Sequence, residues 1–458
     1  MKIARYLPRF RQAYAEFPEL EARERWSRAE IAAYQLDRLN DVWRHAVHHT
    51  PYYRQLHLEH RLPDRFQSLE EFTRSVPLLD KSQVRSSPQQ FLSERRQPGR
   101  WHRTSGSTSI PLQVYRSHEA HFEMLRTNYR YYRMWGHDIF DPMVFLWNQS
   151  RTRTNGLWGA LRGVREGAED QLRNRLRLSA LTLGHDDLRG YLRQIAAFQP
   201  TAMYSYSRAA YLLALEAQEI GFRCPSLKVV NLTSEPASPL VVRTVEAAFG
   251  VPCIVQYGCV ELGYIAGQWP DRTLRVREDI VMVETLPRGD GFYDIVLTCL
   301  NNPSFPLLRY DIGDVTDQPL TAGERGFAIL GNISGRCGDM LYSPRGRALH
   351  PTTADSIFEE NFYQYVRRYQ IHQMADLSLV VLIELNHPQR RPDLKQMAKH
   401  ISRELDGCPT EVRIVDTIQQ TAAGKHRNVI SAARPPTAAR STDAPAAVAA
   451  SRKIASRK

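Results

Sequence analysis

Apolar and polar positions follow a helical period through most of the first 275 residues. Residues 28–49, 119–136 and 239–250 place apolar side chains at helical spacing. Between such segments lie continuous apolar runs of strand length, at residues 142–147, 201–206, 227–234 and 251–258. Because helix and buried strand alternate, the pattern predicts a mostly parallel sheet with helices on its faces.

The period changes to two from about residue 275. The runs DIVMVETL and YDIVLTCL, at 279–286 and 293–300, are joined by PRGDGF, which predicts a hairpin. Beyond residue 336 a smaller α+β pattern follows, with helices expected at 352–361 and 392–405 and strands at 366–373, 377–385 and 411–416. This pattern predicts an α/β protein whose large N-terminal domain has mixed or parallel sheets flanked by helices and a β-rich subdomain. A small, mobile α+β C-terminal domain completes the predicted fold.

Composition and charge refine the domain organisation. The 458 residues carry 61 lysines and arginines against 49 acidic residues, a net charge of +12. Residues 434–458 hold six of these basic residues and one aspartate among Ala, Pro and Ser, so a disordered basic tail is expected. The predicted division is therefore 1–335 for the N-terminal domain, 336–432 for the C-terminal domain and 433–458 for the tail.

Several classes of protein are disfavoured by the sequence. No apolar run approaches the ~18 residues of a membrane span, and the basic N-terminus lacks the apolar core of a signal peptide. The six cysteines form no C-x-x-C pair and have no histidine partner at zinc spacing, which indicates reduced thiols. No nucleic-acid-binding motif is present. A cytoplasmic protein without integral membrane association or a nucleic-acid partner is expected, and a monomer and a homodimer are both open.

Polar loops follow the predicted strands where a ligand would bind. In open α/β sheets ligands lie beyond the carboxyl ends of strands, and TSEPAS (233–238) and YGCVELG (257–263) each follow a buried run. RTSGSTSIP (103–111) is rich in small and hydroxyl residues, whose donors can converge on an anion. It lacks the Walker signature, and an ordinary turn explains the same composition.

Taken in order, these loops resemble motifs of the adenylate-forming superfamily, in its phenylacetate–CoA ligase and capsular-polysaccharide (CapK-like) branch. The resemblance covers nearly the whole chain. It rests on six elements in family order, namely TSGSTSIP (104–111), SEP (234–236), YGCVE (257–261), RYDIGD (309–314), GRCGD (335–339) and GK (424–425).

The resemblance implies a role for residues in each element. The first five residues of the first loop would embrace the ATP β- and γ-phosphates, the SEP loop would pack on adenine, and further residues would contact the nucleotide. These nucleotide-binding residues are Thr104, Ser105, Gly106, Ser107, Thr108, Ser234, Glu235, Pro236, Tyr257, Gly258, Asp314 and Arg336. Asp314 would bind the ribose hydroxyls, Glu261 would hold magnesium, and Lys425 would be the catalytic lysine that reaches the α-phosphate.

Some positions depart from the family pattern or allow two interpretations. Ser109 replaces the usual second glycine of the phosphate loop, and Gly338, followed by Asp339, occupies the expected hinge between the domains. Glycine at a hinge leaves domain rotation easy but fixes its resting position less. Tyr204 and Tyr206 could line the pocket for the acid or could simply be core tyrosines.

The resemblance implies ATP-dependent activation of a small carboxylic acid to an acyl-adenylate. ATP and Mg²⁺ would be required, and coenzyme A is the expected acyl acceptor. An amine or sugar acceptor in polysaccharide or secondary-metabolite synthesis is an alternative, as is a nucleotide-binding homologue without ligase activity. A basic protein that binds anionic surfaces through its tail is a third class.

Overall fold

The computed structural model describes residues 8–433 with gaps. The described residues are 8–104, 112–147, 167, 170–181, 183–288, 291–336, 340–349, 353–354, 357–358, 361–362, 364–387, 389–418 and 428–433. The chain begins with four helices, α1 (Pro8–Arg23), α2 (Arg28–His49), α3 (Pro51–His60) and α4 (Leu69–Ser75). Ser27 and Glu30 form a capping box at the start of α2, so the predicted boundaries 28–49 are confirmed.

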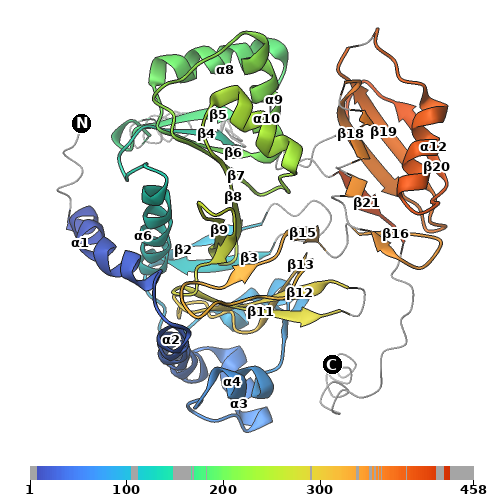
Figure 1. The fold of residues 1–458 in the computed structure, drawn as a ribbon. Coiled ribbons are helices and arrows are strands. Elements are labelled where there is room, and N and C mark those ends of the chain that lie inside the picture. Colours follow the sequence, from blue (N-terminus) through green and yellow to red (C-terminus); the bar gives the residue numbers. More distant parts are fainter. Residues whose placement is uncertain are drawn as a thin grey trace, which may run out of the picture.

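An eight-stranded sheet forms the centre of the molecule (Figure 1). Five neighbouring strands are parallel: β5 (Arg175–Ser179), β4 (Met143–Trp147), β6 (Ala202–Tyr206), β7 (Val229–Thr233) and β8 (Cys253–Cys259). The last four correspond to the predicted apolar runs, whereas the arginine-rich β5 was not predicted. Three antiparallel strands extend the sheet beyond β8, namely β9 (Gly263–Gln268), β10 (Leu274–Val276) and β14 (Ile329–Leu330).

Helices bury the apolar faces of this sheet. α8 (His185–Phe198), α9 (Ser207–Glu219) and α10 (Pro239–Phe249) pack with the parallel strands around a core that includes Leu192, Leu213 and Val245, none of them exposed. α6 (His118–Met134) contributes Tyr131 and Tyr132 to a smaller cluster with Met143 of β4 and Ile254 of β8. The helices predicted at 119–136 and 239–250 are thus present.

A second sheet carries the residues of the predicted β-rich subdomain. β11 (Val281–Pro287) and β12 (Tyr293–Cys299) form the predicted hairpin with an unbroken register, and β13 (Tyr310–Thr316) follows beside β12. The short β1 (Leu79–Asp80) pairs in parallel with β13, which β15 (Ile333–Arg336) also joins. Apolar side chains of α2 and α3 share one core with this sheet.

Two hairpins and a short N-terminal helix connect these layers. α5 (Lys81–Ser86) follows β1 directly, and Asp80 and Gln83 form its capping box. A 3₁₀ turn (Pro88–Phe91) leads to the hairpin of β2 (Gly99–Arg103) and β3 (Gln113–Ser117). β16 (Leu341–Tyr342) and β17 (Ala348–Leu349) form a small hairpin after β15.

The C-terminal region forms a separate four-stranded sheet with its own core. Its strand order is β20 (Thr410–Ile414), β19 (Leu379–Leu385), β18 (Val366–Gln373) and β21 (Val429–Ser431), and α12 (Leu394–Glu404) packs on it. In Figure 1 this sheet, coloured orange, lies beside the end of the molecule that carries α8, α9 and α10. The guanidinium of Arg367 donates a hydrogen bond to the carbonyl of Leu183 across this boundary.

Two features bear on the predicted class of protein. The five described cysteines, at 224, 253, 259, 299 and 408, are all free thiols, as predicted. No helix within the described residues is long and apolar enough to cross a membrane. The predicted tail beyond residue 433 and half of the predicted helix at 352–361 lie outside the described residues or in their gaps.

The turn that follows α6 leads to a buried histidine, His137, which predicts a pH-dependent stability. His137 is 1% exposed, its Nδ1 lies 2.8 Å from Thr201 Oγ1, and burial lowers its pKa to about 4. Between the ordinary pKa of about 6.5 and pH 4, the unfolded chain therefore binds a proton that the folded chain does not. As the pH is lowered from about 6.5 to about 4, we therefore expect the free energy of unfolding to decrease. The contribution of His137 to this decrease is up to about 3 kcal/mol.

Urea denaturation at pH 7 and pH 4.5 measures this contribution. His137→Gln should lose clearly less stability than the wild type between these two pH values. An identical loss in the variant would show that His137 does not account for the effect. His121, whose pKa is also lowered to about 4, provides a second position for the same comparison.

Candidate active site

The loop that carries Glu261 is a tight turn between two antiparallel strands rather than the loop before a helix. β8 ends at Cys259 and β9 begins at Gly263. Gly263 has φ +88°, and a Cβ on Gly258 would lie 2.5 Å from the Gly263 carbonyl oxygen. Only glycine allows the two strands to approach this closely, so these two glycines fix the position of the turn.

The Glu261 carboxylate is buried and held by two donors. Its Oε1 accepts a hydrogen bond from the Tyr310 hydroxyl at 3.1 Å and lies 2.9 Å from Lys81 Nζ. Burial acts to raise the pKa of Glu261, but the Lys81 ammonium and the hydrogen bonds outweigh it, so the pKa is lowered. The carboxylate is therefore ionised at neutral pH. An ionised oxygen donor fits the predicted role as a ligand of Mg²⁺, which needs only one or two carboxylates beside phosphate oxygens.

Lys81 is the residue that the motif analysis missed. It is the first residue of α5, and its Nζ also lies 3.3 Å from the carbonyl oxygen of Ile312. Its partner Glu261 is 180 positions further along the chain, so no local pattern connects the two. The signal in the sequence was the segment SVPLLDKSQVR (75–85), whose lysine follows a short apolar run and a capping aspartate.

Asp314 and Tyr257 meet where the two large sheets approach each other. The Tyr257 hydroxyl, from β8, donates a hydrogen bond to Asp314 Oδ2, from β13, at 2.8 Å. Asp314 is paired with Arg336 of β15 in the strand register, so these two predicted residues are neighbours along the backbone ladder. Both Glu261 and Asp314 act electrostatically on Tyr310 and Tyr257, which places the two carboxylates in one region.

The SEP loop lies at the carboxyl edge of the same parallel sheet. Ser234 follows β7 with φ +68°, a left-handed conformation that turns the chain sharply. The Ser207 hydroxyl donates to the Glu235 carbonyl, and the backbone N–H of Arg208 donates to Glu235 Oε2, both at 3.1 Å. Pro236 lies between Glu235 and α10. The two strand-end segments, SEP and YGCVE, thus lie at one edge as predicted, although YGC belongs to the strand itself.

The ends of the predicted phosphate loop are tied to each other. The Thr104 N–H donates to the Leu112 carbonyl at 2.9 Å, and the Leu112 N–H donates to Thr104 Oγ1 at 3.0 Å. The rest of this loop and the hinge and lysine positions lie outside the described residues, and they remain predictions: Ser105, Gly106, Ser107, Thr108, Ser109, Gly338, Asp339 and Lys425.

The two candidate pocket tyrosines form an aromatic stack with Trp147. The Trp147 ring stacks on Tyr206 at 4.1 Å and on Tyr204 at 5.2 Å between centroids. Tyr206 is 4% exposed and belongs to the core beneath the helices, whereas Tyr204 is half-buried. The core explanation fits Tyr206 better, and Tyr204 remains a candidate for contact with the acid.

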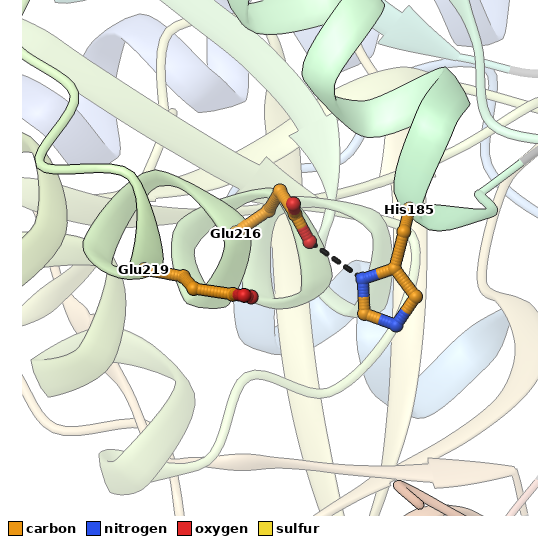
Figure 2. Close-up of side chains that lie close together, drawn as sticks. All are labelled: His185, Glu216 and Glu219. Atoms are coloured by element: carbon orange, nitrogen blue, oxygen red, sulfur yellow. Dashed lines mark hydrogen bonds and ion pairs between the residues drawn. The ribbon is translucent and has the colours of Figure 1, made fainter.

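His185, Glu216 and Glu219 lie close together between α8 and α9 and are residues of the kinds that bind metal ions. An arginine, however, is already paired with the carboxylates of this cluster. Figure 2 shows the Nδ1 of His185 directed at Glu216, with Glu219 beside them. His185 Nδ1 and Arg189 Nε lie 2.7 and 2.5 Å from the two oxygens of Glu216, and Arg189 Nη2 lies 3.3 Å from Glu219. The Arg189 charge already neutralises the carboxylates, so this cluster joins two helices.

Substitution of Gly258 by alanine is expected to lower carboxylate-dependent pyrophosphate exchange into ATP. The new Cβ would collide with the Gly263 backbone and displace the turn that positions Glu261. A shift of about 1 Å in a catalytic group can cost about 10²-fold in rate, and we expect a loss of this order. Gly190→Ala, in α8, is the matched control because its Cβ would meet only Arg193 Nη2, at 3.9 Å. Equal activity of both variants would contradict the prediction.

Comparison with known proteins identifies relatives along most of the chain. No family model matches. The chain is 25% identical to a phenylacetate-coenzyme A ligase of Aromatoleum evansii, over 90% of this chain and 97% of the relative. A phenylacetate-coenzyme A ligase of Thermus thermophilus is 26% identical over 74% and 77%, respectively, and Protein CapK of Staphylococcus aureus is 22% identical over 56% and 59%.

The fold is shared with solved ligase structures. A 2-hydroxyisobutyryl-CoA ligase in the postadenylation state, in complex with R3-HIB-AMP, superposes with a TM-score of 0.71 at 22% identity, over 89% of this chain and 91% of that one. The same ligase in the thioesterification state gives 0.58, over 90% and 91%. The sequence relatives and the shared fold support the predicted similarity of this chain to the phenylacetate–CoA ligase and CapK-like branch of the adenylate-forming superfamily.

Proposed function

We propose that this protein is an AMP-forming acid–CoA ligase that activates a small carboxylic acid with ATP. The observation that carries the proposal is the ionised, buried Glu261 carboxylate, held by Lys81 and Tyr310 beside the Tyr257–Asp314 pair. These groups lie at the carboxyl edge of a parallel sheet, where α/β proteins bind nucleotides. The names of the sequence relatives, phenylacetate-coenzyme A ligases, support the same reaction class.

In the proposed first step, a carboxylate oxygen of the acid attacks the α-phosphorus of ATP. A bond forms from that oxygen to phosphorus, the bond to the bridging oxygen breaks, and pyrophosphate leaves with the electron pair. The carboxylate is already a nucleophile, so the protein has to position the reactants and neutralise charge. Glu261 and Lys81 would supply this electrostatic framework, and Asp314 would orient the ribose. A magnesium ion, when bound, would neutralise phosphate charge near Glu261.

The C-terminal region would act as a mobile lid in this scheme. We assign residues 1–335 to the nucleotide-binding domain and 336–432 to the lid, with Gly338 and Asp339 at the hinge. Lys425 would reach the reacting α-phosphate from the lid. Lys425→Ala is expected to lower pyrophosphate exchange by about 10²-fold, whereas Lys395→Ala, at an exposed position in α12, should retain activity. Full exchange activity in Lys425→Ala would remove Lys425 from this role.

The second step would transfer the acyl group to the coenzyme A thiol, releasing AMP. Transfer of the acyl group to an amine or a sugar is the second candidate reaction. The similarity to Protein CapK supports this alternative. Each acceptor attacks the same acyl carbon, so the first step does not distinguish them.

A screen of carboxylic acids for ATP-dependent pyrophosphate release tests the proposal. Release that depends on one class of acid is the expected result, and omission of each acceptor in turn then identifies the second step. Deletion of residues 434–458 should leave this activity nearly unchanged. Absence of release with every acid, in protein that still binds ATP, would instead support a nucleotide-binding homologue.

A further inference from the structure

The side chain of Arg208, at the start of α9, is a half-buried cation, two of whose guanidinium nitrogens have no hydrogen-bond acceptor among the described residues. Its Nε and Nη2 atoms are shielded from solvent and have no hydrogen-bond partner. Burial lowers the pKa of the guanidinium, and the positive charge of Arg368 lowers it further. A buried charge without a partner is costly, and proteins rarely keep one unless a ligand or an ion pair completes it.

A second arginine faces the same region from the C-terminal sheet. Arg368, in β18, has a buried Nε that also lacks an acceptor among the described residues, while its Nη1 forms an ion pair with Glu384 at 3.7 Å. Its neighbour Arg367 donates to the Leu183 carbonyl and so holds β18 against the N-terminal domain. A guanidinium from helix α9 and one from strand β18 therefore lie in one region, and each has a shielded donor that is not used.

The groups around this pair do not complete it. The negative charge of Glu235 acts on both guanidiniums and so reduces the free-energy cost of placing the two positive charges in one region. The Glu235 side chain also accepts a hydrogen bond, through Oε2, from the Arg208 backbone N–H at 3.1 Å. The Tyr211 ring lies 5.2 Å from the Arg208 guanidinium, and Tyr369 acts on the same guanidinium electrostatically. Among the described residues, no side chain accepts a hydrogen bond from the shielded Nε and Nη2 atoms of Arg208.

We propose that Arg208 and Arg368 form a site for a phosphate group, which bridges the N-terminal domain and the C-terminal sheet. Guanidinium groups match phosphate oxygens in a planar, bidentate geometry, and phosphate oxygens would accept hydrogen bonds from the shielded donors of both arginines. The N-terminal end of α9 adds a favourable field for an anion. The interpretation of the C-terminal sheet as a lid over a nucleotide site rests on the proposed function. The proposal that the two arginines bind a phosphate group does not depend on it.

Isothermal titration calorimetry with inorganic phosphate measures binding at this site directly. Arg208→Gln and Arg368→Gln should each weaken phosphate binding by at least about tenfold, because each removes charge-assisted hydrogen bonds. Arg189→Gln, an exposed arginine on the adjacent helix α8, is the matched control and should bind as the wild type does. Glu261→Gln reports separately on phosphate that binds at the nucleotide site.

The melting temperature of each variant shows whether a loss of phosphate binding results from misfolding. Arg208→Met should melt at a higher temperature than the wild type in phosphate-free buffer, because it removes two shielded donors that have no acceptor among the described residues. Added phosphate should then stabilise the wild type and leave Arg208→Met unchanged. Wild-type phosphate affinity in both Arg208→Gln and Arg368→Gln would overturn the proposal.

The source of the phosphate group is distinguished by kinetics. A rise in KM for coenzyme A in Arg208→Gln, with no change in KM for its 3′-dephospho form, would assign the site to the acyl acceptor. Unchanged KM values for both, with loss of inorganic phosphate binding, would assign it to free phosphate. A protein that releases no pyrophosphate with any acid but still binds phosphate through Arg208 would refute the ligase function and leave this site intact.

Discussion

Replacement of Glu261 by glutamine is expected to lower carboxylate-dependent exchange of pyrophosphate into ATP by about 10²–10³-fold. Glutamine keeps the size of the side chain and one oxygen acceptor for the Tyr310 hydroxyl, so the turn between β8 and β9 should keep its shape. The change removes the negative charge that pairs with Lys81 at 2.9 Å and that would hold magnesium. The loss should therefore appear in catalysis rather than in folding.

Steady-state exchange assays at saturating ATP measure this effect, and the magnesium dependence adds a second readout. Glu216→Gln is the matched control, because Glu216 is also a buried, ion-paired carboxylate but lies between α8 and α9. The control should retain exchange activity. If Glu261→Gln were as active as Glu216→Gln at every magnesium concentration, the proposed site would be wrong.

The Lys81–Glu261 pair allows a sharper version of this experiment. If the two residues act as one electrostatic unit, Lys81→Met combined with Glu261→Gln should lose much less than the product of the two single losses. Independent roles would give multiplicative losses instead.

Replacement of Asp279 by alanine is expected to lower the free energy of unfolding by about 3–5 kcal/mol. Asp279 and Arg130 have side chains only 1% and 2% exposed, and Arg130 Nη1 donates to Asp279 Oδ2 at 2.7 Å. Arg130 also contacts Glu24 at 3.0 Å and the Leu20 carbonyl at 2.9 Å, so the pair joins α1, α6 and the start of β11. Removal of Asp279 leaves the buried Arg130 with Glu24 as its remaining carboxylate partner.

Urea denaturation followed by circular dichroism measures this loss. Asp37→Ala is the control, because Asp37 and Arg65 form an exposed pair at 3.5 Å with 74% and 65% of their side chains accessible. Exposed pairs contribute less than about 1 kcal/mol. A loss of that size in Asp279→Ala would mean that Glu24 alone satisfies Arg130.

The helices and strands were largely predictable because their signals are local. Ser27 with Glu30 and Ser68 with Glu71 mark helix starts by side-chain hydrogen bonds within four residues, and the alternation in 279–300 sets the hairpin register. The central parallel strands were recognisable as apolar runs of strand length between helices. These features depend on neighbours in sequence, which is the range over which a pattern carries information.

The contacts within the site were less predictable because they join distant parts of the chain. Motif order identified Tyr257, Glu261 and Asp314, but the bond between Tyr257 and Asp314 depends on how two sheets approach each other. Lys81 reaches Glu261 only because β1 pairs with β13 and places α5 beside Tyr310. Tyr206 has the same local sequence signal as Tyr204, and both stack on Trp147, so only the burial of Tyr206 in the core beneath the helices separates them.

The paired hydrogen bonds between Thr104 and Leu112 continue the β2–β3 hairpin by one residue pair beyond Arg103 and Gln113. Because these two bonds use the backbone and the Thr104 hydroxyl, we expect a substitution at Ser109 to leave the β2–β3 register unchanged. Ser109→Gly would then compare two phosphate-loop chemistries on one scaffold.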